Sequence, residues 1–286
     1  MSGRHRTAPA WIWRAFFFVA VAGLARAASS SPALPPLAQV GKPDAAEIAR
    51  ILEQFRHAGF FGYFELELHR LPRRGAETVY RGRLWGGRND QGAAMRIELT
   101  DEAGATHRFL LHQGAQPAIW RERDGSAVPV DVAASFAPLL PGLEITAFDL
   151  QMPYLYWPDV TVESVVRMRG RPAYAFVFRP PAEFAAAHRE LTAVRAYFDA
   201  QFSAPTQTEL IGGDKVLKTI ALLDLKKLGE RYIPKAFDLR NELTHDKTRF
   251  VVIGAALDAE FAADVFAPAS LGTTVQPPAG VVAFEP

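Results

Sequence analysis

Apolar and polar residues alternate with a period of two over much of this chain, and this alternation limits its fold more than any other feature. The first run of such segments covers residues 60–69, 78–85, 93–99, 106–112 and 118–123. Successive side chains of a β-strand point to opposite faces, so each segment predicts a half-buried strand. Short loops rich in Gly and Asp separate most of the segments, and such loops join antiparallel neighbours. The pattern therefore predicts an antiparallel meander.

A second run of alternating segments follows after a break. It covers residues 160–168, 173–179, 191–202, 206–211, 216–228, 232–243 and 248–257. Residues 182–190 predict a short helical or loop excursion. The fold class we expect is mainly β (α+β), with about ten to twelve strands by hydrophobic periodicity. One strongly curved antiparallel sheet, an incomplete β-barrel, would fit, and so would two stacked sheets.

Two segments without this alternation predict helices. Asp44 and Glu47 have capping-box spacing ahead of an apolar stripe formed by Ile48, Ile51, Leu52 and Phe55. Residues 130–156 contain three prolines and many apolar side chains, which predicts one or two short helices with loops. Because so apolar a segment is unfavourable in water, we expect it to cover a sheet face or a cavity. We therefore expect helices on the concave face of the sheet.

The N-terminus has the parts of a cleavable export signal. A basic start is followed by an apolar run at residues 15–24 and by Ala25-Arg26-Ala27, so we expect cleavage before Ala28. A run of 10 residues is too short to span a bilayer, which takes about 20. We expect a signal peptide at residues 1–27, a flexible lead-in at 28–42, a single domain at 43–271 and a flexible tail at 272–286.

Composition excludes several classes of function. Lys and Arg total 32 against 31 for Asp and Glu, so net charge gives no reason to expect nucleic acid as a partner. The chain has no cysteine, which excludes disulfides, thiolate metal sites and lipid attachment to Cys. HExxH, G-x-S-x-G and phosphate-binding glycine motifs do not occur. We expect no catalytic residue, no metal and no cofactor.

The candidate ligand-binding residues are the apolar side chains that we assign to the concave face and to the middle segment. They are Phe60, Phe64, Leu66, Leu84, Met95, Ile97, Leu99, Leu110, Leu139, Leu140 and Phe148. Ordinary core packing is the alternative for each of them. Tyr154, Tyr156 and Trp157 lie beside two prolines and are candidates for a lid or for a rim that binds a partner, or for a plug that seals the sheet.

The second half of the chain resembles a known family. The motifs that carry the resemblance are Tyr156-Trp157-Pro158, Gly170-Arg171-Pro172-Ala173-Tyr174, residues 194–198, Pro205-Thr206, residues 213–219 (GDKVLKT), residues 225–229 (LKKLG), Ile233-Pro234-Lys235 and residues 266–271 (FAPASL). In their order and spacing they resemble the outer-membrane lipoprotein-sorting protein family, the LolA-like group, over roughly residues 44–271. The resemblance implies an incomplete antiparallel β-barrel with helices over a hydrophobic cavity.

The resemblance also implies a function. It suggests a non-enzymatic periplasmic carrier that binds a lipid or the acyl chains of a lipoprotein during transport to the outer membrane. The partners would be that ligand and an inner-membrane transporter or an outer-membrane acceptor protein. The alternative is a periplasmic sensor or protein-binding module of similar fold, associated with an envelope transporter or a stress response. An enzyme that uses His188 or His245 has the weakest support.

Overall fold

The computed structural model describes residues 40–56 and 61–285. Their strands are β1 Gly62–Leu71, β2 Thr78–Asn89, β3 Gly92–Thr100, β4 Thr106–His112, β5 Ala118–Arg123, β6 Ser126–Val130, β7 Asp159–Met168, β8 Arg171–Arg179, β9 Ala193–Asp199, β10 Pro205–Gly212, β11 Lys215–Leu228, β12 Arg231–Asn241, β13 Lys247–Leu257 and β14 Val282–Ala283. The helices are α1 Ala45–Arg56, α2 Ala147–Gln151 and α3 Ala182–Ala187, with 3-10 turns η2 Val132–Ala134, η3 Pro153–Tyr156, η4 Ala263–Phe266 and η5 Pro268–Ser270.

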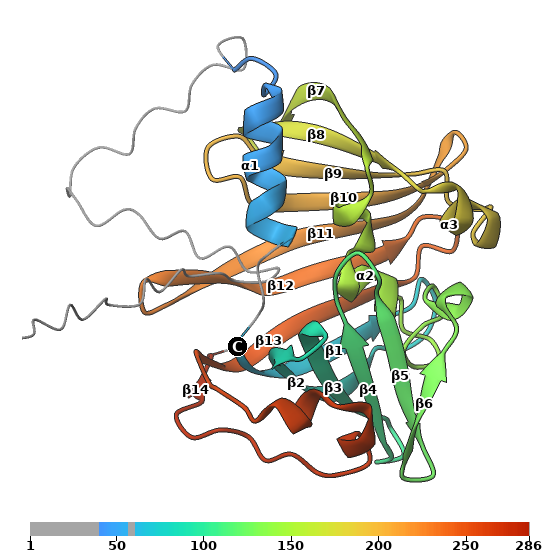
Figure 1. Ribbon diagram of the computed structural model, residues 1–286, viewed down its shortest axis with the longest axis vertical. Coiled ribbons are helices and arrows are strands. Elements are labelled where there is room, and N and C mark those ends of the chain that lie inside the picture. Colours follow the sequence, from blue (N-terminus) through green and yellow to red (C-terminus); the bar gives the residue numbers. More distant parts are fainter. Residues whose placement is uncertain (1–39, 57–60, 286) are drawn as a thin grey trace, which may run out of the picture.

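The described strands form one antiparallel sheet that combines both predicted meanders. Its order is β6-β5-β4-β3-β2-β1-β13-β12-β11-β10-β9-β8-β7, with β14 added to β13. The first strand pairs with the thirteenth, so that Phe64 lies opposite Ala255 and Leu68 opposite Phe250. The outer strands β6 and β7 do not pair with each other, so the curved sheet stays open (Figure 1). This confirms the predicted fold class, a mainly β incomplete barrel.

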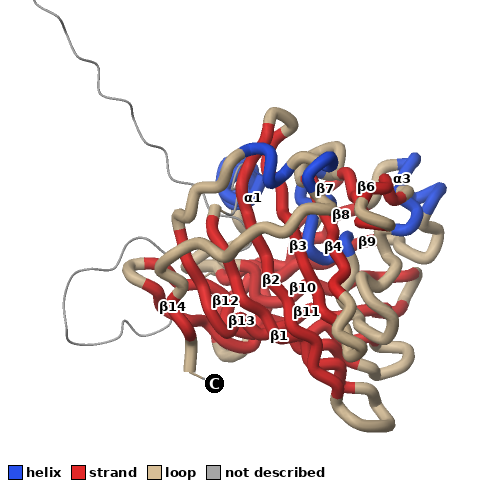
Figure 2. The backbone as a smooth tube through the Cα atoms, turned by 90° about the horizontal axis from the view of Figure 1, so that it is seen from below, coloured by secondary structure: helices blue, strands red, loops and turns tan. Residues whose placement is uncertain are grey.

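Helices and the middle segment cover the concave face of the sheet. Figure 1 shows α1 across the strands of the second meander and α2 between the two meanders, and Figure 2 shows the helices gathered on one side of the sheet. The Asp44 carboxylate accepts a hydrogen bond from the Glu47 backbone N–H at 2.8 Å, which caps α1 as its spacing predicts. Three buried side chains of α1, Ile51, Leu52 and Phe55, pack into the core. Each contributes about 1.5–3 kcal/mol by its burial.

The convex face of the first meander is covered by the C-terminal segment, residues 259–281. Phe266 packs on Trp85 and Tyr63 in a second apolar cluster. Gly87 permits this contact, because a Cβ atom there would lie 2.2 Å from the Phe266 ring. The wholly buried Arg96 donates to the backbone carbonyls of Ser270, Leu271 and Thr273.

Residues 272–285, which we expected to form a flexible tail, pack against the sheet in the structure. Besides the Arg96 contact, β14 pairs with β13, and Phe284 is buried in the main core. The Phe284 N–H also donates to the Ile253 carbonyl at 2.7 Å. We missed β6 and β14 as strands, because β6 is mostly exposed and contains Pro129, and β14 has only 2 residues.

Candidate functional site

The interior that we expected to be a ligand cavity is packed with protein side chains. Six predicted residues on the sheet are at most 5% exposed and share one core cluster with Leu139, Leu140 and Phe148; they are Phe64, Leu66, Leu84, Met95, Ile97 and Leu99. The middle segment covers them, as its apolar character predicts. Phe60 lies outside the described residues.

Leu110 lies on the other face of the sheet. Its register partner in β3 is Arg96, and it packs in the cluster on the convex face. The residues of β4 that point into the barrel are Phe109 and Leu111. Grouping Leu110 with Met95 and Ile97 was wrong because Leu111, not Leu110, is the partner of Met95.

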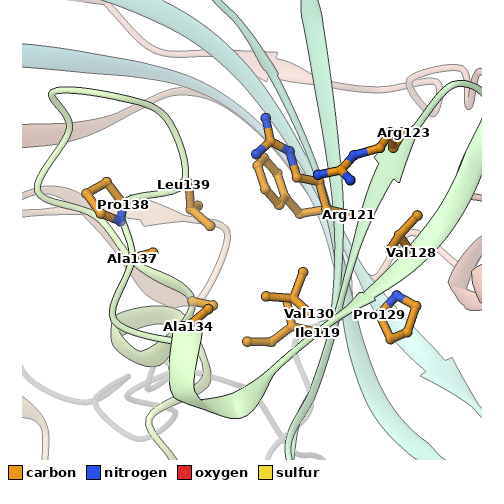
Figure 3. Close-up of a pocket in the computed structure, with 12 residues that line it drawn as sticks. Ile119, Arg121, Arg123, Val128, Pro129, Val130, Ala134, Ala137, Pro138 and Leu139 are labelled. Carbon is orange, nitrogen blue, oxygen red and sulfur yellow. The ribbon is translucent and has the colours of Figure 1, made fainter. Parts of the chain in front are cut away.

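A cavity of about 400 Å³ lies at the open end of the first meander (Figure 3). One wall is the concave face of β4, β5 and β6, and the other is the start of the middle segment. Its lining residues are Phe109, Ile119, Arg121, Arg123, Val128, Pro129, Val130, Ala134, Ala137, Pro138, Leu139 and Ala147. Leu139 is the single member of our predicted set among them. We call this cavity the groove, and it is the candidate functional site.

The sheet wall of the groove follows from strand register. Arg121 lies opposite both Phe109 and Val128, and Ile119 lies opposite Val130. Register partners in antiparallel strands point to the same face, so these side chains form one surface. Because β6 is the last strand on this side among the described residues, none of the described strands closes the groove.

The opposite wall is a compact loop with small side chains. The Asp131 carboxylate accepts from Ala133 N–H at 2.8 Å and caps η2. Leu139 N–H donates to the Ile145 carbonyl at 2.9 Å, which closes the loop between η2 and α2. The alanines at 134, 137 and 147 that face the groove carry only a methyl group, and this leaves the space open.

Buried polar groups fix α2 to the sheet. Asp149, at 3% exposure, accepts from the Thr146 N–H and hydroxyl at 2.8 Å each, and it forms an ion pair with Lys218 of β11. On the other side, the Gln151 amide donates to the carbonyls of His112 and Ala118 at 2.7 and 3.0 Å. These contacts hold the loop wall against both meanders.

Two arginines of β5 border the apolar lining. Arg121 lies over the Phe109 ring at 5.6 Å and contacts the His107 ring nitrogen Nδ1 at 3.5 Å. Arg123 is exposed. Among the described residues, neither guanidinium forms an ion pair with a carboxylate. Figure 3 shows both side chains on the same side of the cavity, with Ile119 and Val130 on another.

The aromatic residues that we considered as a rim lie inside the molecule. Tyr154 and Trp157 are 4% and 5% exposed and pack with Phe148 and Phe178, while Tyr156 is half-buried. Burial raises the pKa of the Tyr154 hydroxyl above its ordinary value. The Tyr156 hydroxyl donates to the Arg56 carbonyl and so ties η3 to α1. Of the roles that we considered, the structure favours a plug.

The two histidines considered for an enzyme lie in different environments. His188 is 2% exposed and packs against the rings of Phe136 and Phe184. His245 is exposed in the turn after β12, where it contacts Arg240. Within the described part of the chain, no group of three His, Asp or Glu residues is placed to hold a metal ion.

A second cavity, of about 310 Å³, lies between the turn that joins β7 and β8, the turn that joins β9 and β10, and the middle of β11. Its lining includes four charged residues, Arg169, Arg171, Asp199 and Asp224. Arg171 and Asp199 already form a hydrogen-bonded ion pair at 2.5 Å. Since its charged groups are partly satisfied by each other, this cavity is a weaker candidate than the groove.

Comparison with known proteins gives a match at the level of fold. A domain described as an outer membrane lipoprotein-sorting protein from Vibrio parahaemolyticus aligns with a TM-score of 0.65 at 14% identity, covering 77% of this chain and 94% of that one. A DUF1329 family protein from Desulfovibrio piger gives 0.67 at 11% identity, with 81% and 100% covered. A LolA superfamily protein from Nitrosomonas europaea gives 0.60 at 12% identity, with 78% and 97% covered. No protein-family model and no curated protein matches the sequence.

These alignments establish that the chain has a LolA-like fold. At 11–14% identity they show the fold alone. Within residues 40–56 and 61–285, no helix is long and apolar enough to cross a membrane.

Proposed function

We propose that the protein is a non-enzymatic periplasmic carrier that binds the apolar chain of a lipid or lipoprotein in the groove. The observation that carries this proposal is the cavity of about 400 Å³ lined mainly by apolar side chains, next to an interior that the protein's own side chains fill. Small-molecule sites typically have volumes of about 300–1,000 Å³ and predominantly apolar linings.

Binding in this groove would be driven by burial of apolar surface. Such burial gives about 25 cal/mol for each Å² removed from water, less the cost of ordering the ligand. An acyl chain thus needs no charged partner to bind.

The periplasmic assignment is supported by the sequence of the N-terminus. Residues 15–27 have the apolar run and the A-x-A pattern of a cleavable export signal. With no cysteine, the exported chain has no site for a lipid anchor on Cys. The proposed partners are a lipid or lipoprotein, together with a membrane transporter or acceptor protein that supplies or receives it.

The alternative of a sensor or protein-binding module has less support. As one alternative we considered a rim of Tyr154, Tyr156 and Trp157 that contacts a partner protein, but Tyr154 and Trp157 are buried and Tyr156 is half-buried. A partner would have to displace them from the core or use another surface.

The proposal is tested by filling the groove. Ala137→Trp places a large side chain at an exposed position that lines the cavity. The matched control is Ala133→Trp, at an exposed position of the same loop that does not line it. Binding of the neutral fluorescent probe phenylnaphthylamine and its displacement by dodecanol are measured by fluorescence.

We expect the wild-type protein and Ala133→Trp to bind the probe and dodecanol. Ala137→Trp should weaken both by at least about tenfold, or 1.4 kcal/mol. Equal binding by the two variants, or no binding by the wild-type protein, would contradict the proposal.

A further inference from the structure

The groove combines an apolar lining with two cations that form no ion pair with any acidic residue in the described part of the chain. Arg121 and Arg123 are two residues apart on β5, so their side chains leave the strand on the same, concave face. Two like charges side by side repel each other and are unfavourable unless an anion lies between them. The apolar neighbours Phe109 and Val128 do not supply one.

Two acidic residues near the arginines, Asp101 and Glu122, are already engaged elsewhere. Asp101 accepts from the His107 ring nitrogen Nε2 at 2.8 Å and from the backbone N–H groups of Ala103 and Ala105, which together hold the pKa of its carboxyl below its ordinary value. Glu122 is the neighbour of both arginines in the chain, but alternation sends it to the other face, where it accepts from Gly125 N–H at 2.6 Å.

His107 places the Arg121 guanidinium. With Nε2–H donating to Asp101, the Nδ1 atom of His107 is an acceptor that faces Arg121 Nη2 at 3.5 Å. The Phe109 ring supports the guanidinium from one side at 5.6 Å. Arg121 is thus held at the edge of the apolar lining, with the remaining N–H groups of its guanidinium free to bind a ligand.

We propose that the groove binds a single-chain amphiphile with an oxyanion head, a carboxylate or a phosphate monoester. Arg121 and Arg123 bind the head, and the apolar walls bind the chain. Guanidinium groups suit this chemistry because their planar fork donates two parallel hydrogen bonds to an oxyanion. This inference rests on the proposed function, since it names the ligand class of the same groove.

The size of the groove favours one chain over two. At about 30 Å³ for each water-sized group, a cavity of about 400 Å³ holds on the order of 13 such groups. One chain of about a dozen carbons fills that space. A ligand with two or three acyl chains would leave the others outside the groove.

The test compares ligands that share a chain and differ in the head. Dodecanoate and dodecyl phosphate are titrated below their critical micelle concentrations, and dodecanol below its solubility limit, by displacement of phenylnaphthylamine. Acetate and inorganic phosphate report on the head alone. The wild-type protein should bind at least one of the two anionic amphiphiles about tenfold more tightly than dodecanol, as charge-assisted hydrogen bonds predict. Which of the two binds more tightly identifies the head.

Two variants assign the preference to the arginines. The double variant Arg121→Gln/Arg123→Gln should lose the preference for anionic amphiphiles and keep the affinity for dodecanol. Arg88→Gln is the matched control, because Arg88 is exposed on β2 and does not line the groove. It should retain the full preference.

Val128→Glu gives a second route that leaves both arginines in place. Val128 is 38% exposed and lies opposite Arg121 in the register, so a glutamate there would pair with the guanidinium and take the place of the ligand head. Anionic amphiphiles should then bind no better than dodecanol. Val128→Glu therefore tests the role of the arginines even if the double variant does not fold.

The outcomes separate this inference from the proposed function. Equal affinity of the wild-type protein for dodecanol and both anionic amphiphiles, or a preference that survives in Val128→Glu, would overturn the oxyanion inference and leave the apolar carrier intact. Tight binding of acetate or inorganic phosphate alone, with no gain from the chain, would overturn both. So would a failure of all three amphiphiles to bind.

Discussion

The ion pair between Lys218 and Asp149 fixes one wall of the groove, and we expect its loss to cost a large part of the protein's stability. The Asp149 side chain is 2% exposed and that of Lys218 is 12% exposed. In Lys218→Met, the carboxylate keeps its bonds to Thr146 but loses its cation in a nearly dry environment. Glu144 is nearby, and burial raises the pKa of its carboxyl above the ordinary value although Asn241 and Lys218 act to lower it. Lys218 thus compensates the buried Asp149 and the half-buried Glu144.

Removing one partner of a buried ion pair typically costs about 3–5 kcal/mol. A typical domain has a free energy of unfolding of about 5–15 kcal/mol. A loss of this size should therefore be measurable by urea denaturation at neutral pH. The double variant Lys218→Met/Asp149→Asn removes the uncompensated charge and should recover part of the loss. Because Ala147 of α2 lines the groove, Lys218→Met should also weaken dodecanol binding. A cost below about 1 kcal/mol would refute the reasoning, since it would mean that water reaches Asp149.

Two further predictions concern the rest of the sheet. Arg96→Met removes the donor to three carbonyls of the C-terminal segment, so unfolding free energy should fall by about 3 kcal/mol and hydrogen exchange in residues 264–275 should rise; unchanged exchange would contradict this anchoring role. At Asp199, burial by itself raises the carboxyl pKa, but the hydrogen bonds and charge of the Arg171 guanidinium, together with the backbone N–H groups of Phe202 and Gln201, hold the pKa below the ordinary 3.8. The resulting stability is present above that ordinary value and is lost as pH falls through the depressed one. Asp199→Asn should therefore lose less stability than the wild-type protein on acidification from about pH 5 to pH 2. Equal losses of stability in the two proteins would count against a stabilising ion pair between Arg171 and Asp199.

The strands were predictable because their signal is local. A period-two pattern follows from the geometry of a strand whatever lies on either side of it, and twelve of the fourteen strands come from it. We did not predict the strand β6, because its alternation covers only 5 residues and includes Pro129, a residue found in edge strands.

The position of the site was not predictable in the same way. Leu110 and Leu111 are both wholly buried, because the C-terminal segment covers the face that alternation alone assigns to solvent. The groove exists because small side chains of residues 134–147 face β4–β6 across a gap. Which apolar side chains fill the interior and which leave space depends on packing between segments remote in sequence. The alternation of apolar and polar residues predicted the concave face of the sheet. It did not predict which part of that face is left unfilled by side chains.

The measurement that most directly tests the account is native mass spectrometry of the protein purified without detergent from a bacterial envelope, followed by organic extraction. The account predicts a mass excess over the chain that extracts as a lipid or fatty acyl species, present in the wild-type protein and in Ala133→Trp but absent from folded Ala137→Trp. A mass equal to that of the chain alone, or a lipid excess that persists in Ala137→Trp, would contradict binding in the groove.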